Sequence, residues 1–177
     1  MGYRTDYITR AMKFIQQIDK YLTDCHSFCD YTYAVNAFNV DHKRNVIIES
    51  GLTRVCLLTS DYVIKINCGS SNNLSTFGDC DVECKFYEFA ESEGMEYLLA
   101  KITKVEYCSH AYYIMPRINN VGTGGADVED YLDSDEADWV SAHLYDMHDG
   151  NYGFDDITED PIIIDYACVK SFEHYEG

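Results

Sequence analysis

Three short runs of β-branched and aliphatic residues within residues 46–67 constrain the fold more than any other feature of the chain. The turn-forming pairs Ser50-Gly51 and Ser60-Asp61 separate the runs. Strands joined by such short turns pair with their neighbours in antiparallel order. The pattern therefore predicts an antiparallel meander, with strands at residues 46–48, 55–58 and 62–66.

Helical periodicity lies on both sides of this meander. Apolar residues at three- and four-residue steps predict a helix at residues 5–25, and they are Ile8, Met12, Ile15, Ile18 and Leu22. A second helix is expected at residues 79–93, followed by strands at residues 102–107 and 111–115. A small antiparallel sheet with a helix on it belongs to the α+β class.

A change of composition at residues 119–138 predicts a hinge. This stretch has three glycines and a dense acidic tract, and we expect a helix at residues 134–145 after it. A hairpin of residues 152–154 against 162–164 should close the chain. The expected division is an N-terminal helical segment at 1–45, a sheet with a helix at 46–118, and a smaller C-terminal part at 119–177.

Polar residues with the chemistry of a phosphate site gather in the C-terminal part. Asp146 and Asn151 flank Met-His-Asp-Gly at the end of the expected helix, and Asp165 follows the run Ile162-Ile163-Ile164 one hairpin later. Asp146 and Asn151 would also suit an ordinary turn. A further candidate, Lys65 in the expected strand at residues 62–66, would also suit a solvated strand edge. Asp165 is costly in an apolar run unless it is paired, metal-bound or at the open end of the strand.

The order Asp, four residues, Asn, hairpin, aliphatic run, Asp resembles the catalytic loop and metal-binding segment of protein kinases. The nearest resemblance is to small kinase-like proteins encoded by bacteriophages, which share an Asp-x-His-x-Gly-Asn loop, and it covers about residues 46–167. It implies a protein-kinase-like fold with a small N-lobe sheet and a truncated C-lobe, and ATP and Mg²⁺ as cofactors. Asp146 would be the catalytic base, with Asn151 and Asp165 as metal ligands.

The same resemblance implies nucleotide contacts from the first half of the chain. Lys65 would contact the α and β phosphates, and Glu83, which shares a helix face with Phe86 and Ala90, would be its partner. Gly51 stands in the turn that covers the phosphates, and Met115 in the hinge strand that meets adenine.

The chain departs from the kinase pattern at three places. The phosphate-covering turn has one glycine, and Leu144 stands two residues before Asp146, where kinases usually have His. Only 12 of the 177 residues follow Asp165, so we expect the activation segment and the peptide-docking helices to be absent. The acceptor of a phosphoryl group is therefore not identified by the resemblance.

The formal charge of −18 limits the partners. Direct binding of nucleic acid through phosphates needs clusters of Lys and Arg that the sequence lacks. An alternative to the enzyme is a non-catalytic acidic phage effector with the same fold, which would inhibit a basic host protein. A nucleic-acid mimic is a weaker alternative, because Tyr and aliphatic residues fill the strand-like runs. No apolar run has membrane-spanning length, so no membrane partner is expected.

The eight cysteines favour free thiols over a disulfide framework. Cys25, His26 and Cys29, with Cys80 and Cys84, come closest to a metal-ligand spacing, but no matched pair of Cys-x-x-Cys motifs is present. The expected location is the cytoplasm, which is the host cytoplasm for a phage-encoded protein.

Overall fold

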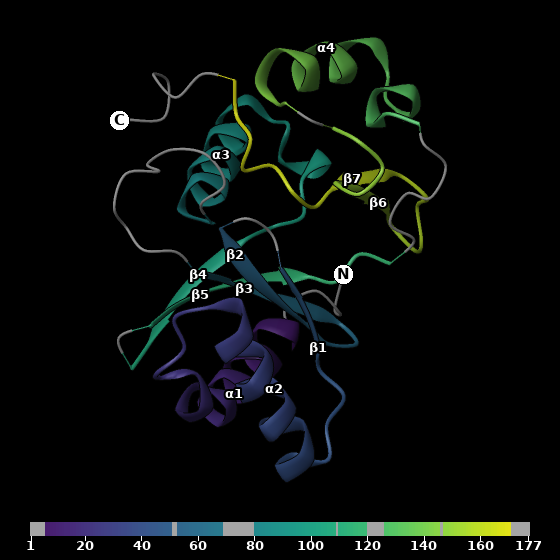
Figure 1. Ribbon diagram of the computed structural model, residues 1–177. Helices are drawn as coiled ribbons and strands as arrows, with labels where there is room; N and C mark the ends of the chain where they lie inside the picture. The colour runs from purple at the N-terminus through teal and green to yellow at the C-terminus, as the bar shows by residue number, and fades with distance from the viewer. Residues whose placement is uncertain are drawn as a thin grey trace. The chain divides into compact units, whose positions relative to one another are not determined.

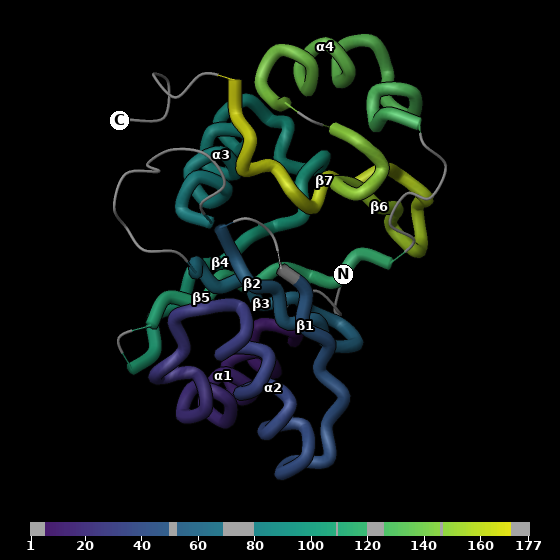
Figure 2. The backbone as a smooth tube through the Cα atoms, in the orientation of Figure 1, coloured from purple at the N-terminus to yellow at the C-terminus, as the bar shows by residue number. Residues whose placement is uncertain are grey.

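The computed structural model describes residues 6–50, 53–68, 80–108, 110–119, 126–145 and 147–170 (Figures 1 and 2). Its contacts divide the chain into two compact units. The first unit comprises Met1–Leu74 with Thr103–Arg117, and the second comprises Ser75–Ile102 with Ile118–Gly177. Both units contain helices and antiparallel strands, which confirms the α+β class.

An antiparallel sheet of five strands forms the centre of the first unit. The strands are β1 (Ile47–Ser50), β2 (Arg54–Leu58), β3 (Tyr62–Asn67), β4 (Thr103–Tyr107) and β5 (His110–Pro116). They lie in the order β1-β2-β3-β5-β4, and each neighbouring pair is antiparallel. The meander and the two later strands are confirmed.

Side chains alternate between the two faces of this sheet, as the pleat requires. Val55, Ile64 and Ile114 lie on the face that forms the hydrophobic core. Lys65 follows Ile64 and so points to the opposite face, where its cross-strand neighbours are Cys56 and Tyr113. The sheet thus separates Lys65 from the core of the first unit.

Two helices cover the core face of the sheet, as Figure 1 shows. α1 (Asp6–Leu22) matches the expected helix. Its predicted apolar side is confirmed in part, because Ile15, Ile18 and Leu22 are buried and Ile8 and Met12 are half-buried. α2 (Phe28–His42) lies inside the expected helical segment but was not predicted as a separate helix. The apolar residues of α2 lie on all sides of the helix, since Val35 is buried and Tyr33 is 78% exposed. The one-sided apolar periodicity that predicts an amphipathic helix is therefore missing.

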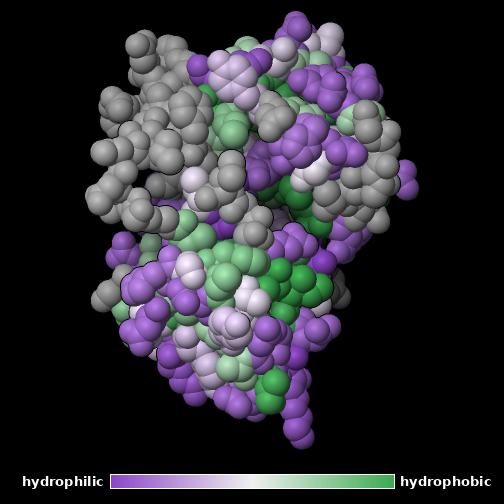
Figure 3. All heavy atoms as spheres, in the orientation of Figure 1, coloured by the Kyte–Doolittle hydropathy of each residue, from purple (hydrophilic) through white to green (hydrophobic). Residues whose placement is uncertain are grey.

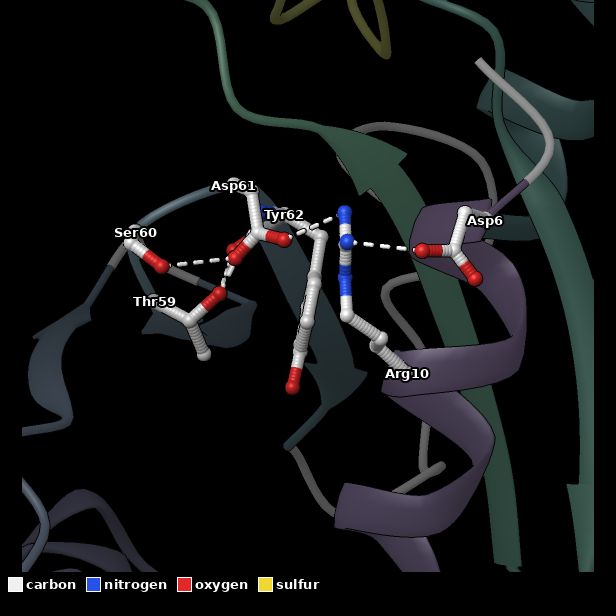
Figure 4. A network of polar contacts seen from close by, with 6 residues as sticks. All are labelled: Asp6, Arg10, Thr59, Ser60, Asp61 and Tyr62. Carbon is white, nitrogen blue, oxygen red and sulfur yellow. Dashed lines mark hydrogen bonds and ion pairs between the residues drawn. The ribbon is translucent and has the colours of Figure 1, made fainter. Parts of the chain in front are cut away.

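A bridge of charged groups joins α1 to the turn between β2 and β3 (Figure 4). Arg10 Nη2 lies 2.6 Å from Asp61 Oδ2, and Arg10 Nη1 lies 2.9 Å from Asp6 Oδ2. Ser60 Oγ donates to Asp61 Oδ1 at 2.7 Å, which orients that carboxylate. All three charged side chains are at least a third exposed, so these ion pairs contribute little to stability.

A buried carboxylate joins the other end of α1 to the sheet. Asp19 Oδ1 accepts a hydrogen bond from the Tyr112 hydroxyl at 2.6 Å and lies 2.9 Å from His110 Nδ1. Burial, followed by the hydrogen bond to Asp19, raises the pKa of Tyr112. These contacts satisfy a carboxylate that would otherwise be costly inside the protein.

The second unit contains the remaining elements. They are α3 (Cys80–Glu93), the 3₁₀ turns η1 (Glu96–Leu98) and η2 (Val128–Tyr131), α4 (Ser134–His143), β6 (Tyr152–Phe154) and β7 (Pro161–Ile163). β6 and β7 pair antiparallel, with Gly153 opposite Ile162, so the expected closing hairpin is confirmed. A Cβ at Gly153 would lie 2.7 Å from Ile118 Cγ2, which explains a glycine there.

The expected division of the chain differs from the observed units in two ways. Residues 1–45 are not a separate segment, because α1 and α2 share one core with the sheet. α3 belongs by its contacts to the second unit, so its packing on the sheet stays a prediction. The boundary between Arg117 and Ile118 lies next to the expected one at residue 118.

Among the described residues, no helix combines the length and the apolar character needed to cross a membrane.

Candidate functional site

The chain segments that follow α4 and β7 pair with each other in the second unit. Leu144 and Val169 form an antiparallel bridge. The N–H of Tyr145 donates to the carbonyl of Cys168 at 2.8 Å, and the N–H of Lys170 donates to the carbonyl of His143 at 2.8 Å. The segment that leads toward Asn151 therefore runs beside the segment that carries Asp165.

Asn151 and Asp165 are directly connected through the backbone. The carbonyl oxygen of Asn151 accepts hydrogen bonds from the N–H of Ile164 at 2.8 Å and from the N–H of Asp165 at 3.2 Å. Both candidate ligands are half-buried. The structure thus brings together two residues that the sequence separates by a hairpin.

A compact turn of residues 148–151 also holds the backbone N–H of Asn151. The N–H of Asn151 donates to the carbonyl of His148 at 2.9 Å, and the N–H of Gly150 donates to His148 Nδ1 at 3.0 Å. His148 Nε2 also lies 3.5 Å from Nδ2 of the Asn151 side chain. A Cβ at Gly150 would lie 2.9 Å from His148 Cε1, so the turn suits glycine.

Glu83 lies fully buried on α3 and contacts the segment that carries Asp165. Its Oε1 accepts a hydrogen bond from the N–H of Tyr166 at 3.4 Å. Phe86, Tyr87 and Ala90 are buried with it, which confirms the predicted helix face. Glu83 therefore supports the residue that directly follows Asp165.

Lys65 and Met115 belong to the first unit. Lys65 is 5% exposed on β3, and Met115 is 2% exposed on β5, where it pairs with Val63. The expected pairing of Lys65 with Glu83 would connect the two units and stays a prediction. Gly51 and Asp146 lie outside the described residues.

Two tyrosines of the site were not predicted. Tyr152 and Tyr166 directly follow Asn151 and Asp165, and both are fully buried. The Tyr152 hydroxyl donates to the carbonyl of Ala126 at 2.9 Å, and the Tyr166 hydroxyl donates to the carbonyl of Ala100 at 2.7 Å. No local sequence signal identified them, because their partners lie 26 and 66 residues away along the chain.

Formal charge is distributed very unevenly between the units. The first unit has ten Lys and Arg against eight Asp and Glu, and the second has three against 23. The first therefore carries +2 and the second −20, which together give the −18 of the chain. A unit with a formal charge of −20 tends to repel free phosphates and attract cations.

The donor atoms of Asn151 and Asp165 are hard oxygens of the kind that Mg²⁺ prefers. Within the described parts of the chain, no group of three or more His, Cys, Asp and Glu side chains could hold a metal ion. Two protein ligands nevertheless fit Mg²⁺, which usually takes one or two carboxylates together with waters and substrate phosphates.

Comparison of the chain with protein-family models, with curated proteins and with solved structures found no match.

Proposed function

We propose that the chain binds ATP with Mg²⁺ through Asn151 and Asp165 and acts as a minimal kinase-like phosphotransferase toward an unidentified acceptor. The observation that carries this proposal is the double hydrogen bond from Ile164 and Asp165 to the carbonyl oxygen of Asn151. These backbone bonds hold side by side the two segments that carry an amide and a carboxylate side chain. Such pairs of oxygen ligands are the part of a phosphoryl-transfer site that the protein itself must supply.

The surrounding charge supports a metal-dependent mode of binding. A nucleotide without a cation would bring its phosphates into a unit with a formal charge of −20. Bound magnesium would neutralise part of that phosphate charge. We therefore expect nucleotide and Mg²⁺ to bind together, with little affinity for ATP alone.

The other roles rest on the resemblance to kinases. Asp146 would accept the proton of the acceptor hydroxyl as its oxygen bonds to phosphorus and ADP departs. Lys65 would contact the α and β phosphates, and Gly51 and Met115 would lie along the nucleotide. Glu83 would hold the segment of Asp165 in position through its hydrogen bond to Tyr166.

Thermal-shift titration with ATP in the presence and absence of Mg²⁺ tests the proposal. A ligand at 100 times its Kd stabilises the folded state by about 2.7 kcal/mol, which corresponds to roughly 5–10 °C in Tm for a chain of this size. Asp165→Asn removes the charged ligand and should abolish the shift. Asp160→Asn is the matched control, because it removes the same charge from an exposed residue of the β6–β7 hairpin.

Three results would contradict the proposal. The wild type could show no shift at millimolar ATP with Mg²⁺, the shift could be the same without Mg²⁺, or Asp165→Asn could keep it. Loss of the shift in Asp160→Asn as well would indicate an effect of net charge rather than of a specific ligand.

A second candidate function is inhibition of a basic host protein without catalysis. The observation that favours it is the charge of −20 on the second unit alone. Such a surface would steer a basic partner and make binding fall steeply with ionic strength. This function takes the place of the first if the wild type shows no ATP-dependent shift.

A further inference from the structure

A tyrosine directly follows each candidate metal ligand, and both its aromatic ring and its hydroxyl contact other segments of the unit. Tyr152 is 1% exposed and Tyr166 is 0% exposed, and each hydroxyl donates to a backbone carbonyl of a distant segment. The Tyr152 ring packs 5.9 Å from that of Tyr131, and the Tyr166 ring packs 6.0 Å from that of Phe86. Buried aromatic rings with a bonded hydroxyl have few alternative positions.

These contacts limit the backbone at the ligands themselves. Tyr166 is also held through its N–H, which donates to Glu83 Oε1 at 3.4 Å. The backbone of Asp165 is therefore held next to an anchored Tyr166, and the backbone of Asn151 next to an anchored Tyr152. Since Asn151 and Asp165 are also bonded to each other, the positions of their backbones are fixed relative to one another.

We propose that Tyr152 and Tyr166 are positioning residues that fix the spacing of the Asn151 and Asp165 oxygens and so make the site select Mg²⁺ over Ca²⁺. This inference rests on the proposed function. Mg²⁺ demands near-ideal octahedral geometry at about 2.0–2.1 Å, whereas Ca²⁺ accepts flexible geometry at about 2.3–2.6 Å. A rigid pair of ligands matches the smaller ion, and a loosened pair admits the larger one.

Tyr152→Phe and Tyr166→Phe test the proposal, because each removes one hydroxyl and keeps the ring. Tyr112→Phe is the control, since it removes an equally buried hydroxyl, bonded to Asp19 at 2.6 Å, from the first unit. Titration calorimetry would measure the Kd of ATP with Mg²⁺ and with Ca²⁺ for each protein. We expect the preference for Mg²⁺ to fall at least about tenfold, or about 1.4 kcal/mol, in both test variants and to stay unchanged in Tyr112→Phe.

Hydrogen exchange gives a second readout that needs no nucleotide. The amides of Ile164 and Asp165, which donate to Asn151, should exchange faster in Tyr152→Phe and Tyr166→Phe than in the wild type. The amide of Lys170, which donates to His143 in the same unit, is the internal reference and should change less. If the two tyrosine hydroxyls only stabilise the unit as a whole, the exchange rates of all three amides should rise by the same factor.

The outcomes separate the two proposals. If the wild type binds ATP with Mg²⁺ but the variants keep its cation preference and its exchange pattern, the positioning role is overturned and the proposed function stands. If the wild type binds ATP with neither cation, the proposed function fails and cation selection fails with it. Uniform acceleration of exchange in that case would also overturn the positioning of Asn151 against Asp165.

Discussion

The backbone N–H of Asp165 donates to the carbonyl oxygen of Asn151 across 3.2 Å. This bond uses main-chain atoms only, so it does not depend on the side chain of either residue. Substitutions of the two side chains should therefore leave the local fold in place. They test the chemistry of the site rather than its assembly.

Gly153→Ala should destabilise the protein by about 1–3 kcal/mol, because the added methyl group would collide with Ile118 and with the backbone of Asn119. Its Cβ would lie 2.7 Å from Ile118 Cγ2 and 3.0 Å from the carbonyl oxygen of Asn119. Chemical denaturation measures the change in the free energy of unfolding. Ile118→Ala removes the closer atom, so a double-mutant cycle should show favourable coupling between the two substitutions. Strict additivity would contradict the steric explanation.

Strand pairing and most helix bounds could be predicted from the sequence because their signals are local. Alternation and short turns in residues 46–67 determine β1 to β3, and one-sided periodicity determines α1. α2 lacked that signal, because Tyr33 and Val40 are each 78% exposed opposite its buried side. The capping box of Ser27 and Asp30 was the available local sign of its start.

The candidate site could be predicted in part, for a related reason. Asn151 and Asp165 carry chemistry that residue type and order indicate directly. The hydroxyl contacts of Tyr152 and Tyr166 are with carbonyls 26 and 66 residues away, and such contacts have no local signature. The assignment of α3 to the second unit likewise depends on long-range packing.

Stability should fall as the pH rises above about 10, the ordinary pKa of tyrosine. Burial raises the pKa of Tyr31 to about 12 in the folded protein. The unfolded chain therefore releases this proton first, and the stability that Tyr31 contributes is complete below pH 10 and is lost between about pH 10 and 12. Denaturant titrations from pH 8 to 12, with tyrosinate absorbance, measure this loss.

Tyr31→Phe should flatten the alkaline loss of stability, because its ring cannot ionise. Tyr33→Phe is the matched control on the same helix, since Tyr33 is 78% exposed. An equal effect of both substitutions would show that burial of Tyr31 is not the cause.

All eight thiols should react with a thiol reagent under denaturing, non-reducing conditions, because the structure places none of the eight cysteines in a disulfide. In the native protein, exposed Cys29 and Cys108 should react first and fully buried Cys80 last. Burial raises the pKa of Cys25 and of Cys68, so less reactive thiolate is present there near neutral pH. Peptide mapping after timed labelling gives the order, and early labelling of Cys80 would contradict the packing of α3.

Asp146→Ala should separate binding from catalysis. A base that accepts the acceptor proton contributes mainly in the transition state, so the Kd of ATP with Mg²⁺ should change less than about twofold. Any phosphoryl transfer, or slow ATP hydrolysis, should fall by about 10²- to 10⁴-fold. Asp165→Ala should instead abolish binding if Asp165 is the metal ligand proposed above, and Asp160→Ala should affect neither quantity. Titration calorimetry and release of ADP measure the two quantities in the same preparations.

Loss of binding in Asp146→Ala would make Asp146 a binding residue rather than the base. Unchanged hydrolysis in a variant that still binds ATP would remove it from the mechanism.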